Sequence, residues 1–173
     1  MNRWNLAALL LLPLLAFTVP ARASEPTIVG GAAFQLEASR GSLYDIPYDS
    51  LELGAGIGFR RQDSPLTFHW LGVLGRGATQ NGLTIWTVAT NVSVDISFWK
   101  LHLEPTAGMG MITVNRITSS DTLFGFSWPV ALYAGPSFDL DGSRLAIDLA
   151  LRADIARNAS GHGFGLRVRY ELF

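Results

Sequence analysis

The chain has 173 residues, of which 49% are hydrophobic and only 16% are charged, and it contains no cysteine. Soluble domains place about a quarter of their residues in the charged class, so this composition excludes intrinsic disorder and points to a membrane protein. The absence of cysteine excludes a disulfide scaffold and a thiolate metal site. The balance of 13 basic against 14 acidic residues argues against a nucleic-acid partner.

The first 23 residues have the pattern of a secretory signal peptide. Arg3 supplies a positive charge, Leu6–Val19 is almost entirely apolar, and Ala21-Arg22-Ala23 offers an Ala-x-Ala cleavage site. An apolar run of this length is too short to span a bilayer as a helix. We expect cleavage after Ala23, which divides the chain into a signal peptide, 1–23, and a single domain, 24–173; a retained N-terminal anchor is the alternative.

Beyond the signal peptide, apolar and polar residues alternate with the period of two that is typical of β-strands. For example, Leu145, Ile147 and Leu149 alternate with Ala146 and Asp148. Eight segments share this pattern, although for the third of them both faces are apolar and the inward face stays open. We expect strands within Thr27–Ala38, Leu51–Arg60, Leu66–Arg76, Thr84–Phe98, Leu101–Met111, Trp128–Asp139, Arg144–Asp154 and Gly163–Leu172.

The connections between these segments are predicted to alternate between long loops and tight turns. Such an alternation is typical of an antiparallel up-and-down meander whose two termini lie at the tight-turn end. The predicted tight turns are Arg61–Pro65, Trp99–Lys100 and Leu140–Ser143. The predicted loops are Ser39–Ser50, Gly75–Gly82 and Asn115–Gly125, with a shorter one at Asn158–Gly161.

The two faces of the meander differ in a way that indicates its solvent. One face is rich in leucine, valine, isoleucine and phenylalanine, and the other carries glycine, alanine, serine and scattered charges. The interior of an eight-stranded barrel is just filled by side chains, so small and charged residues fit inside it and the apolar face points outward, to lipid. We therefore predict an all-β fold, an eight-stranded antiparallel up-and-down transmembrane β-barrel with strands of about 9–11 residues. A secreted soluble barrel that binds a lipophilic ligand is the alternative.

Aromatic residues on the apolar face gather at two heights, as the aromatic girdles of membrane barrels do. Near the tight-turn end we expect Phe59, Phe98, Trp99, Phe138 and Tyr170, and near the loop end Trp86, Trp128 and Phe164.

In this architecture the chain resembles the small eight-stranded outer-membrane β-barrels of Gram-negative bacteria, of the outer membrane protein A and X type. The C-terminal strand, Val168–Phe173, ends in the phenylalanine that is typical of this family and that the barrel-assembly machinery is thought to read. The family usually has an aromatic residue two positions earlier, where this chain has Glu171, so either Leu172 takes the lipid-facing position or a bulge turns Phe173 outward. The resemblance implies localisation in the outer membrane, contact with its lipids and lipopolysaccharide, and assembly by periplasmic chaperones and the barrel-assembly machinery.

The charged residues of the inward face are the candidate functional residues. Because an unpaired buried charge is costly, we expect them to pair with one another across the lumen. Three interpretations stay open: a polar filling that fixes the strand register, an ion-pair gate in a narrow, low-conductance pore, and a ligand-linked or proton-linked role for His102 and Glu104. The predicted lumen charge network consists of Glu37, Glu52, Arg60, Asp95, His102, Glu104, Asp148, Arg152, Asp154, Arg167, Arg169 and Glu171.

Enzymatic activity is the third functional hypothesis, because some barrels of this size act on lipid A. None of the three histidines forms the His-x-Ser pair of the deacylase group, but His162 with Ser160, and Asp121 with neighbouring serines at 119–120, allow a triad at the loop end. We expect no enzyme, no catalytic residue, no metal and no cofactor. The predicted role is structural, or contact with an unknown surface ligand through the loops. The apolar residues of these loops could mark a binding surface, but we expect them instead to fold back onto the barrel mouth or to lie in the headgroup layer; they include Leu43, Tyr44, Ile46, Pro47, Tyr48, Ile117, Leu123 and Phe124.

Overall fold

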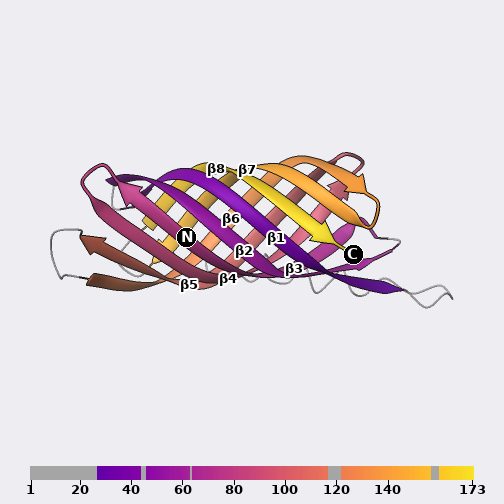
Figure 1. The fold of residues 1–173 in the computed structure, drawn as a ribbon, viewed down its shortest axis with the longest axis horizontal. Helices are drawn as coiled ribbons and strands as arrows, with labels where there is room; N and C mark the ends of the chain where they lie inside the picture. Colours follow the sequence, from indigo (N-terminus) through magenta and orange to yellow (C-terminus); the bar gives the residue numbers. More distant parts are fainter. Residues whose placement is uncertain (1–26, 44–45, 63, 117–121, 157–159) are drawn as a thin grey trace, which may run out of the picture.

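Eight antiparallel strands form one closed barrel, in which each strand pairs with its neighbours in sequence and β1 also pairs with β8 (Figure 1). The computed structural model describes residues 27–43, 46–62, 64–116, 122–156 and 160–173. The predicted fold class is confirmed. The strands are β1 (Ile28–Leu43), β2 (Ile46–Arg61), β3 (Leu66–Thr79), β4 (Leu83–Phe98), β5 (Leu101–Arg116), β6 (Thr122–Leu140), β7 (Ser143–Ala156) and β8 (Ser160–Leu172).

The two ends of the barrel are named here by their connections. At the turn end, β1 begins, β8 ends, and short connections follow β2, β4 and β6. The opposite end is the loop end. Gly142 in the β6–β7 connection has φ 69°, and Trp99 in the β4–β5 connection has φ 59°. This left-handed conformation is uncommon for a residue other than glycine, and at Trp99 the tight turn requires it.

Three of the predicted long loops have the wrong bounds, because the strands continue into them; in Asn115–Gly125, β5 extends to Arg116 and β6 begins at Thr122. β1 extends to Leu43 and β2 starts at Ile46, so most of the segment 39–50 is a paired hairpin, and β3 extends to Thr79. Cross-strand contacts support the longer β1–β2 ladder: Arg40 pairs with Asp49 at 2.7 Å, and the hydroxyls of Ser39 and Ser50 lie 2.7 Å apart. The strands accordingly have 13 to 19 residues rather than the predicted 9–11.

The predicted inward and outward faces agree with the side-chain burial in seven strands. For β3, whose inward face the sequence left open, the burial shows which side chains point inward. In β3, Thr67, His69, Leu71 and Val73 point inward and are buried, whereas Trp70 is 59% exposed. All eight aromatic residues of the predicted belts are exposed. The barrel therefore has an apolar outer surface around a largely polar interior.

Apolar residues also occur inside the barrel, at positions where the sequence analysis expected small or polar ones. Leu43, Ile85 and Ile112 form a buried cluster, against which Tyr48 and Val114 pack. These residues lie near the loop-end termini of β1, β2, β4 and β5. Of the apolar residues in the predicted loop 39–50, Leu43 and Tyr48 thus fold into the barrel mouth, whereas Pro47 is exposed.

The predicted signal peptide, 1–23, and the loop residues Tyr44 and Ile117 lie outside the described residues. Among the residues that are described, no helix is long and apolar enough to cross a membrane.

Candidate functional site

The charged interior is organised around Glu104, a fully buried carboxylate on β5. It accepts hydrogen bonds from Ser93 on β4 and from Arg167 and Arg169, both on β8. Arg169 also donates to Asp95, so that a single guanidinium joins two carboxylates of neighbouring strands. Charge-assisted bonds of this kind are about twice as strong as neutral ones, and they fix the position of the long arginine side chains.

Two histidines connect this centre to further carboxylates. His69 lies between two glutamates, with Nδ1 3.3 Å from Glu104 and Nε2 3.0 Å from Glu171. His102 Nε2 lies 2.8 Å from Asp148, which also accepts a 2.7 Å hydrogen bond from Arg167 Nε. These residues form what we call the Glu104 cluster: His69, Asp95, His102, Glu104, Arg144, Asp148, Arg167, Arg169 and Glu171.

Two members of the Glu104 cluster were missed by the sequence analysis. Arg144 lies 3.4 Å from Asp95 and donates to Ser97 at 2.9 Å. It has the same parity as Asp148 along β7, so the alternation places it on the inward face. It was not assigned to the lumen because it lies directly after the β6–β7 turn. His69 could not be assigned because both faces of β3 are apolar.

A second group of charges, which we call the Arg152 cluster, consists of Glu37, Glu52, Arg152 and Tyr133. Glu37 and Glu52 are directly opposite each other on β1 and β2, an arrangement of like charges that is unfavourable by itself. Arg152 Nη1 relieves it, because it lies 3.0 Å from Glu37 and 2.8 Å from Glu52. The Tyr133 hydroxyl donates to the other oxygen of Glu37 at 2.8 Å.

Tyr133 also links the two clusters. The guanidinium carbon of Arg167 lies 3.5 Å from the centroid of its ring, within the range of a cation–π contact. The charges of the two clusters therefore form one connected set of contacts rather than separate pairs.

The signs of the clustered charges are distributed unequally over the strands. Of the six carboxylates in the two clusters, Glu37, Glu52, Asp95 and Glu104 belong to β1, β2, β4 and β5, and Asp148 and Glu171 belong to β7 and β8. The arginines of both clusters belong to the last hairpin, namely Arg144 and Arg152 on β7 and Arg167 and Arg169 on β8. The interior contacts therefore join the C-terminal hairpin to β1 and β2 next to it and, across the lumen, to β4 and β5.

Ten of the twelve residues predicted for the lumen charge network take part in these contacts, and two do not. Asp154 is buried near the loop end, and the ion pairs of the described residues do not include it. Arg60 lies at the turn end, where its guanidinium covers the ring of Phe173 at 4.9 Å.

The C-terminal residue, whose direction was open, points inward. A Cβ atom on Gly31 would lie 3.0 Å from the Phe173 ring, and one on Gly58 would lie 3.6 Å from it, so the ring covers these two glycines. Leu172, which is 44% exposed, takes the outward position. The first of the two predicted arrangements is thus correct for Leu172, and Phe173 closes part of the turn end.

A metal ion is one chemical use that the interior donors could have. Asp95, His102 and Glu104 each offer a ligand atom, and these three atoms lie within 4.8 Å of one another. However, Asp95 and Glu104 already bind the guanidinium of Arg169, which occupies their oxygens and places a positive charge beside them. These carboxylates therefore bind the guanidinium of Arg169 in place of a metal ion.

The catalytic candidates at the loop end are only partly described. Asp121, the serines at 119–120 and the side chain of Ser160 lie outside the described part of the chain. His162 instead has Ser42 as its neighbour, with Nδ1 3.4 Å from the hydroxyl oxygen. This exposed pair lacks, among the described residues, the carboxylate partner that orients the histidine in a catalytic triad.

The exposed Arg40–Asp49 pair lies on the outer surface of the same end. A bidentate hydrogen bond from Arg40, at 2.7 and 3.0 Å, lowers the pKa of the Asp49 carboxyl below its ordinary value. Because both groups are fully exposed, water and salt screen this interaction.

Three solved structures with a similar fold each match over most of this chain. Neisserial surface protein A matches with a TM-score of 0.55 and 10% identity, over 83% of this chain and 97% of that one. Ail, the attachment invasion locus protein of Yersinia pestis, matches with a TM-score of 0.54 and 10% identity over the same shares. The N-terminal β-barrel domain of OprF from Pseudomonas aeruginosa matches with a TM-score of 0.50 and 12% identity, over 83% of this chain and all of that domain.

The fold is therefore that of the small eight-stranded outer-membrane β-barrels. At identities of 10–12% the property shared with these proteins is the fold. No protein-family model and no curated protein matches the sequence.

Proposed function

We propose that this chain is an integral outer-membrane protein whose barrel has a structural or surface-contact role, with a lumen filled by ion-paired side chains. The observation that carries the proposal is the inverted distribution of residues. Leucine, valine, phenylalanine and tryptophan cover the outside, while the carboxylates and arginines of the two clusters are buried inside. In water this arrangement would be unstable, and in a bilayer it satisfies both surfaces.

The partners that this surface implies are lipids. A belt of exposed leucine, isoleucine and valine side chains, bordered by tryptophan and phenylalanine, fits the hydrocarbon core and the two headgroup layers of a bilayer. Export through a cleaved signal peptide and delivery by periplasmic chaperones to the barrel-assembly machinery are parts of the same proposal. The loop end, with its extended β1–β2 hairpin, would face the exterior and the lipopolysaccharide.

The lumen is proposed to be closed rather than conducting. Three layers support this: the Phe173 ring at the turn end, the two ion clusters, and the apolar group of Leu43, Ile85 and Ile112 near the loop end. An ion that passed through would have to displace buried charge-assisted bonds such as those of Arg169. This favours a filled barrel over the narrow pore, which is the alternative.

Fractionation tests the membrane assignment. The chain, expressed with its own N-terminus in a Gram-negative host, is expected in the outer-membrane fraction and should migrate differently on a gel before and after boiling, as folded barrels do. Recovery in the soluble periplasmic fraction, with identical mobility of both samples, would contradict the proposal.

Planar-bilayer recording tests the closed lumen separately. Pure refolded chain is expected to give no reproducible conductance steps. Regular conductance steps of one size, absent from samples in which the gel shows no folded barrel, would favour the pore and refute the filled lumen. The membrane assignment would stand in either case.

A further inference from the structure

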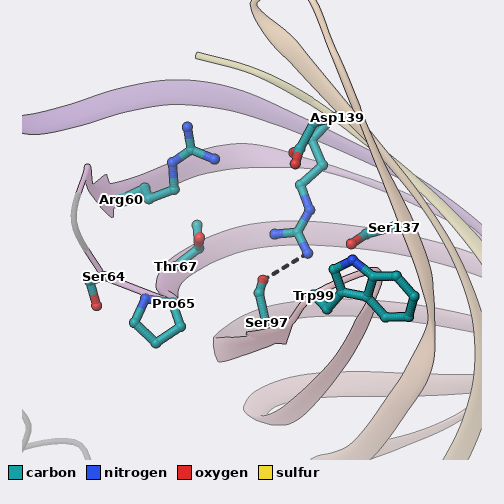
Figure 2. Close-up of a pocket in the computed structure, with 9 residues that line it drawn as sticks. Arg60, Ser64, Pro65, Thr67, Ser97, Trp99, Ser137 and Asp139 are labelled. Carbon is teal, nitrogen blue, oxygen red and sulfur yellow. Dashed lines mark hydrogen bonds between the residues drawn. The ribbon is translucent and has the colours of Figure 1, made fainter.

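A cavity of about 100 Å³ opens at the turn end, beside the Glu104 cluster, whose Arg144 forms part of the wall (Figure 2). It is bordered by all three tight connections of this end: Ser64 and Pro65 from the β2–β3 connection, Trp99 from the β4–β5 connection, and Asp139 next to the β6–β7 connection. A single buried water needs about 10–15 Å³ of such space. The cavity therefore has room for several waters or for one tetrahedral oxyanion.

The cavity has two arginine side chains in its wall, and they differ in the hydrogen bonds and ion pairs that they form with the rest of the chain. Arg144 is 4% exposed, and its two terminal nitrogens contact Asp95 and Ser97, the latter bond being drawn as the dashed line in Figure 2. Arg60 forms none of the ion pairs of the described residues, and its buried Nε has no hydrogen-bond partner among them. The Arg60 guanidinium lies over the ring of Phe173, 4.9 Å from its centroid, and its Nε remains available to an acceptor that is not part of the chain.

Hydroxyl groups complete the lining on other sides. Ser137 and Thr67 are buried at the wall, and the Ser64 oxygen accepts a 3.1 Å bond from the Leu66 amide, which leaves its own proton to donate. Figure 2 shows Arg60, Thr67, Ser64 and Ser137 on different sides of the same space. Donors that converge from several strands match an acceptor with oxygens in several directions, as a phosphate has.

One carboxylate opposes this charge. Asp139 lies at the edge of the cavity and is directly opposite Arg144 in the β6–β7 register. It is exposed, so its charge is screened by water, whereas Arg144 is buried. Because the charge of Arg144 is shared with Asp95, Arg60 is the positive group left to face a ligand in the cavity.

We propose that this turn-end cavity is a binding site for a phosphate group, held mainly by Arg60 and by the hydroxyls of Ser64, Thr67 and Ser137. The phosphate could belong to a free anion or to the headgroup of a phospholipid in the adjacent leaflet. Trp99, which is 91% exposed at the rim, and Lys100, 5.6 Å from its ring, lie where such a headgroup would be. The site goes beyond the proposed function, since a filled barrel in the outer membrane needs no phosphate site.

The test uses the chain refolded in a non-ionic detergent without phosphate. One arm titrates sodium phosphate at constant ionic strength by calorimetry, and the other titrates dihexanoyl phosphatidylglycerol below its micelle concentration. Saturable binding is expected in at least one arm, and Arg60→Gln should weaken it about tenfold or more, as expected for the loss of a charge-assisted bond. Binding of the free anion alone or of the lipid alone identifies the source.

Two further variants keep the test decisive. Arg76→Gln removes an outward arginine that covers Trp86 at 5.4 Å, near the loop end, and should leave phosphate binding unchanged. Ser137→Ala removes one lining hydroxyl with little risk to folding and should weaken binding severalfold. Absence of binding in both arms, or equal binding by wild type, Arg60→Gln and Ser137→Ala, would overturn the proposal while leaving the membrane assignment intact.

Discussion

Glu104 on β5 and Arg169 on β8 form an ion pair through the interior of the barrel, although their strands do not touch in the sheet. Both side chains are fully buried. In a barrel whose sheet contacts all run between neighbouring strands, such a pair connects opposite walls directly. Its removal should therefore affect the whole molecule rather than one hairpin.

Replacing Glu104 by glutamine should reduce the free energy of unfolding by about 3–5 kcal/mol, because Arg167 and Arg169 would keep a buried charge without their shared carboxylate. Urea titration of the refolded chain, followed by tryptophan fluorescence, measures this. Asp49→Asn makes the same chemical change at a fully exposed carboxylate and should leave the unfolding free energy within error. Equal effects of both substitutions on the unfolding free energy would show that the interior ion pair contributes no more to stability than an exposed one.

The apolar belt predicts that the cost of an outward arginine depends on its depth in the bilayer. Leu149 lies in the middle of β7 and is 68% exposed, so Leu149→Arg should cost about 2–4 kcal/mol in lipid vesicles. Leu140 ends β6 at the turn end, and Leu140→Arg should cost only about 0–1 kcal/mol. In vesicles of a thinner lipid, the free-energy costs of the two substitutions should become more similar. An equal cost at both positions in all lipids would argue against a lipid-facing belt.

Glycines of β3 should respond to alanine according to the face they occupy. A Cβ on Gly75 would lie 2.2 Å from Thr87 Oγ1 and 2.8 Å from Glu52 Cγ, inside the barrel, whereas a Cβ on outward-facing Gly72 meets its nearest atom at 3.8 Å. We expect Gly75→Ala to destabilise the barrel by about 1–3 kcal/mol. Gly72→Ala should be neutral or stabilising by about 0.4–1 kcal/mol. Unfolding titrations that rank the two variants in the opposite order would contradict the assigned faces.

The extended β1–β2 hairpin predicts slow amide exchange in a segment that the sequence suggests is a loop. Amides of the ladder within 39–50 should be protected in refolded barrel, and Asp49→Asn should reduce their protection by removing the bond to Arg40. Since folding lowers the pKa of Asp49, its contribution is present above the ordinary aspartate pKa of about 3.9 and is lost as the pH falls through the lower folded value. Protection factors across this range check the direction, and high salt should diminish the effect.

The Ser42–His162 contact gives the enzymatic hypothesis a precise test. Since the described surroundings of His162 lack an orienting carboxylate, expression of the chain should leave the acyl composition of lipid A unchanged, as measured by mass spectrometry. A change that occurs with wild type and disappears with Ser42→Ala would instead establish a lipid-modifying activity.

The alternation of residues was sufficient to predict the fold and most of the interior. Residues on strands with one clearly apolar face, such as Arg167 and Asp148, could be assigned to the lumen by parity alone. His69 could not, because β3 is apolar on both faces, and Arg144 was hidden by its place beside a turn. Parity also cannot say which charges meet, since Glu104 and Arg169 lie far apart in sequence and on strands that do not pair.

The lengths of the strands were the least predictable property. Small and turn-favouring residues such as Ser39, Gly41 and Pro47 suggested a loop, yet the ladder continues because cross-strand pairs and the burial of Leu43 outweigh those local preferences. The turn-end cavity was likewise beyond sequence reasoning, because it is made by three connections that only barrel closure brings together.

The separation of the clustered arginines, all on β7 and β8, from the carboxylates of β1, β2, β4 and β5 has a consequence for the order of assembly. A sheet of the first six strands would carry interior carboxylates with no inward arginine from these clusters to neutralise them. The last hairpin therefore acts as a counter-charged closing piece, and barrel closure and charge neutralisation become a single event. A peptide of β7 and β8 supplied separately should complement a chain truncated after β6 and, if its four arginines are replaced by glutamine, should cease to do so.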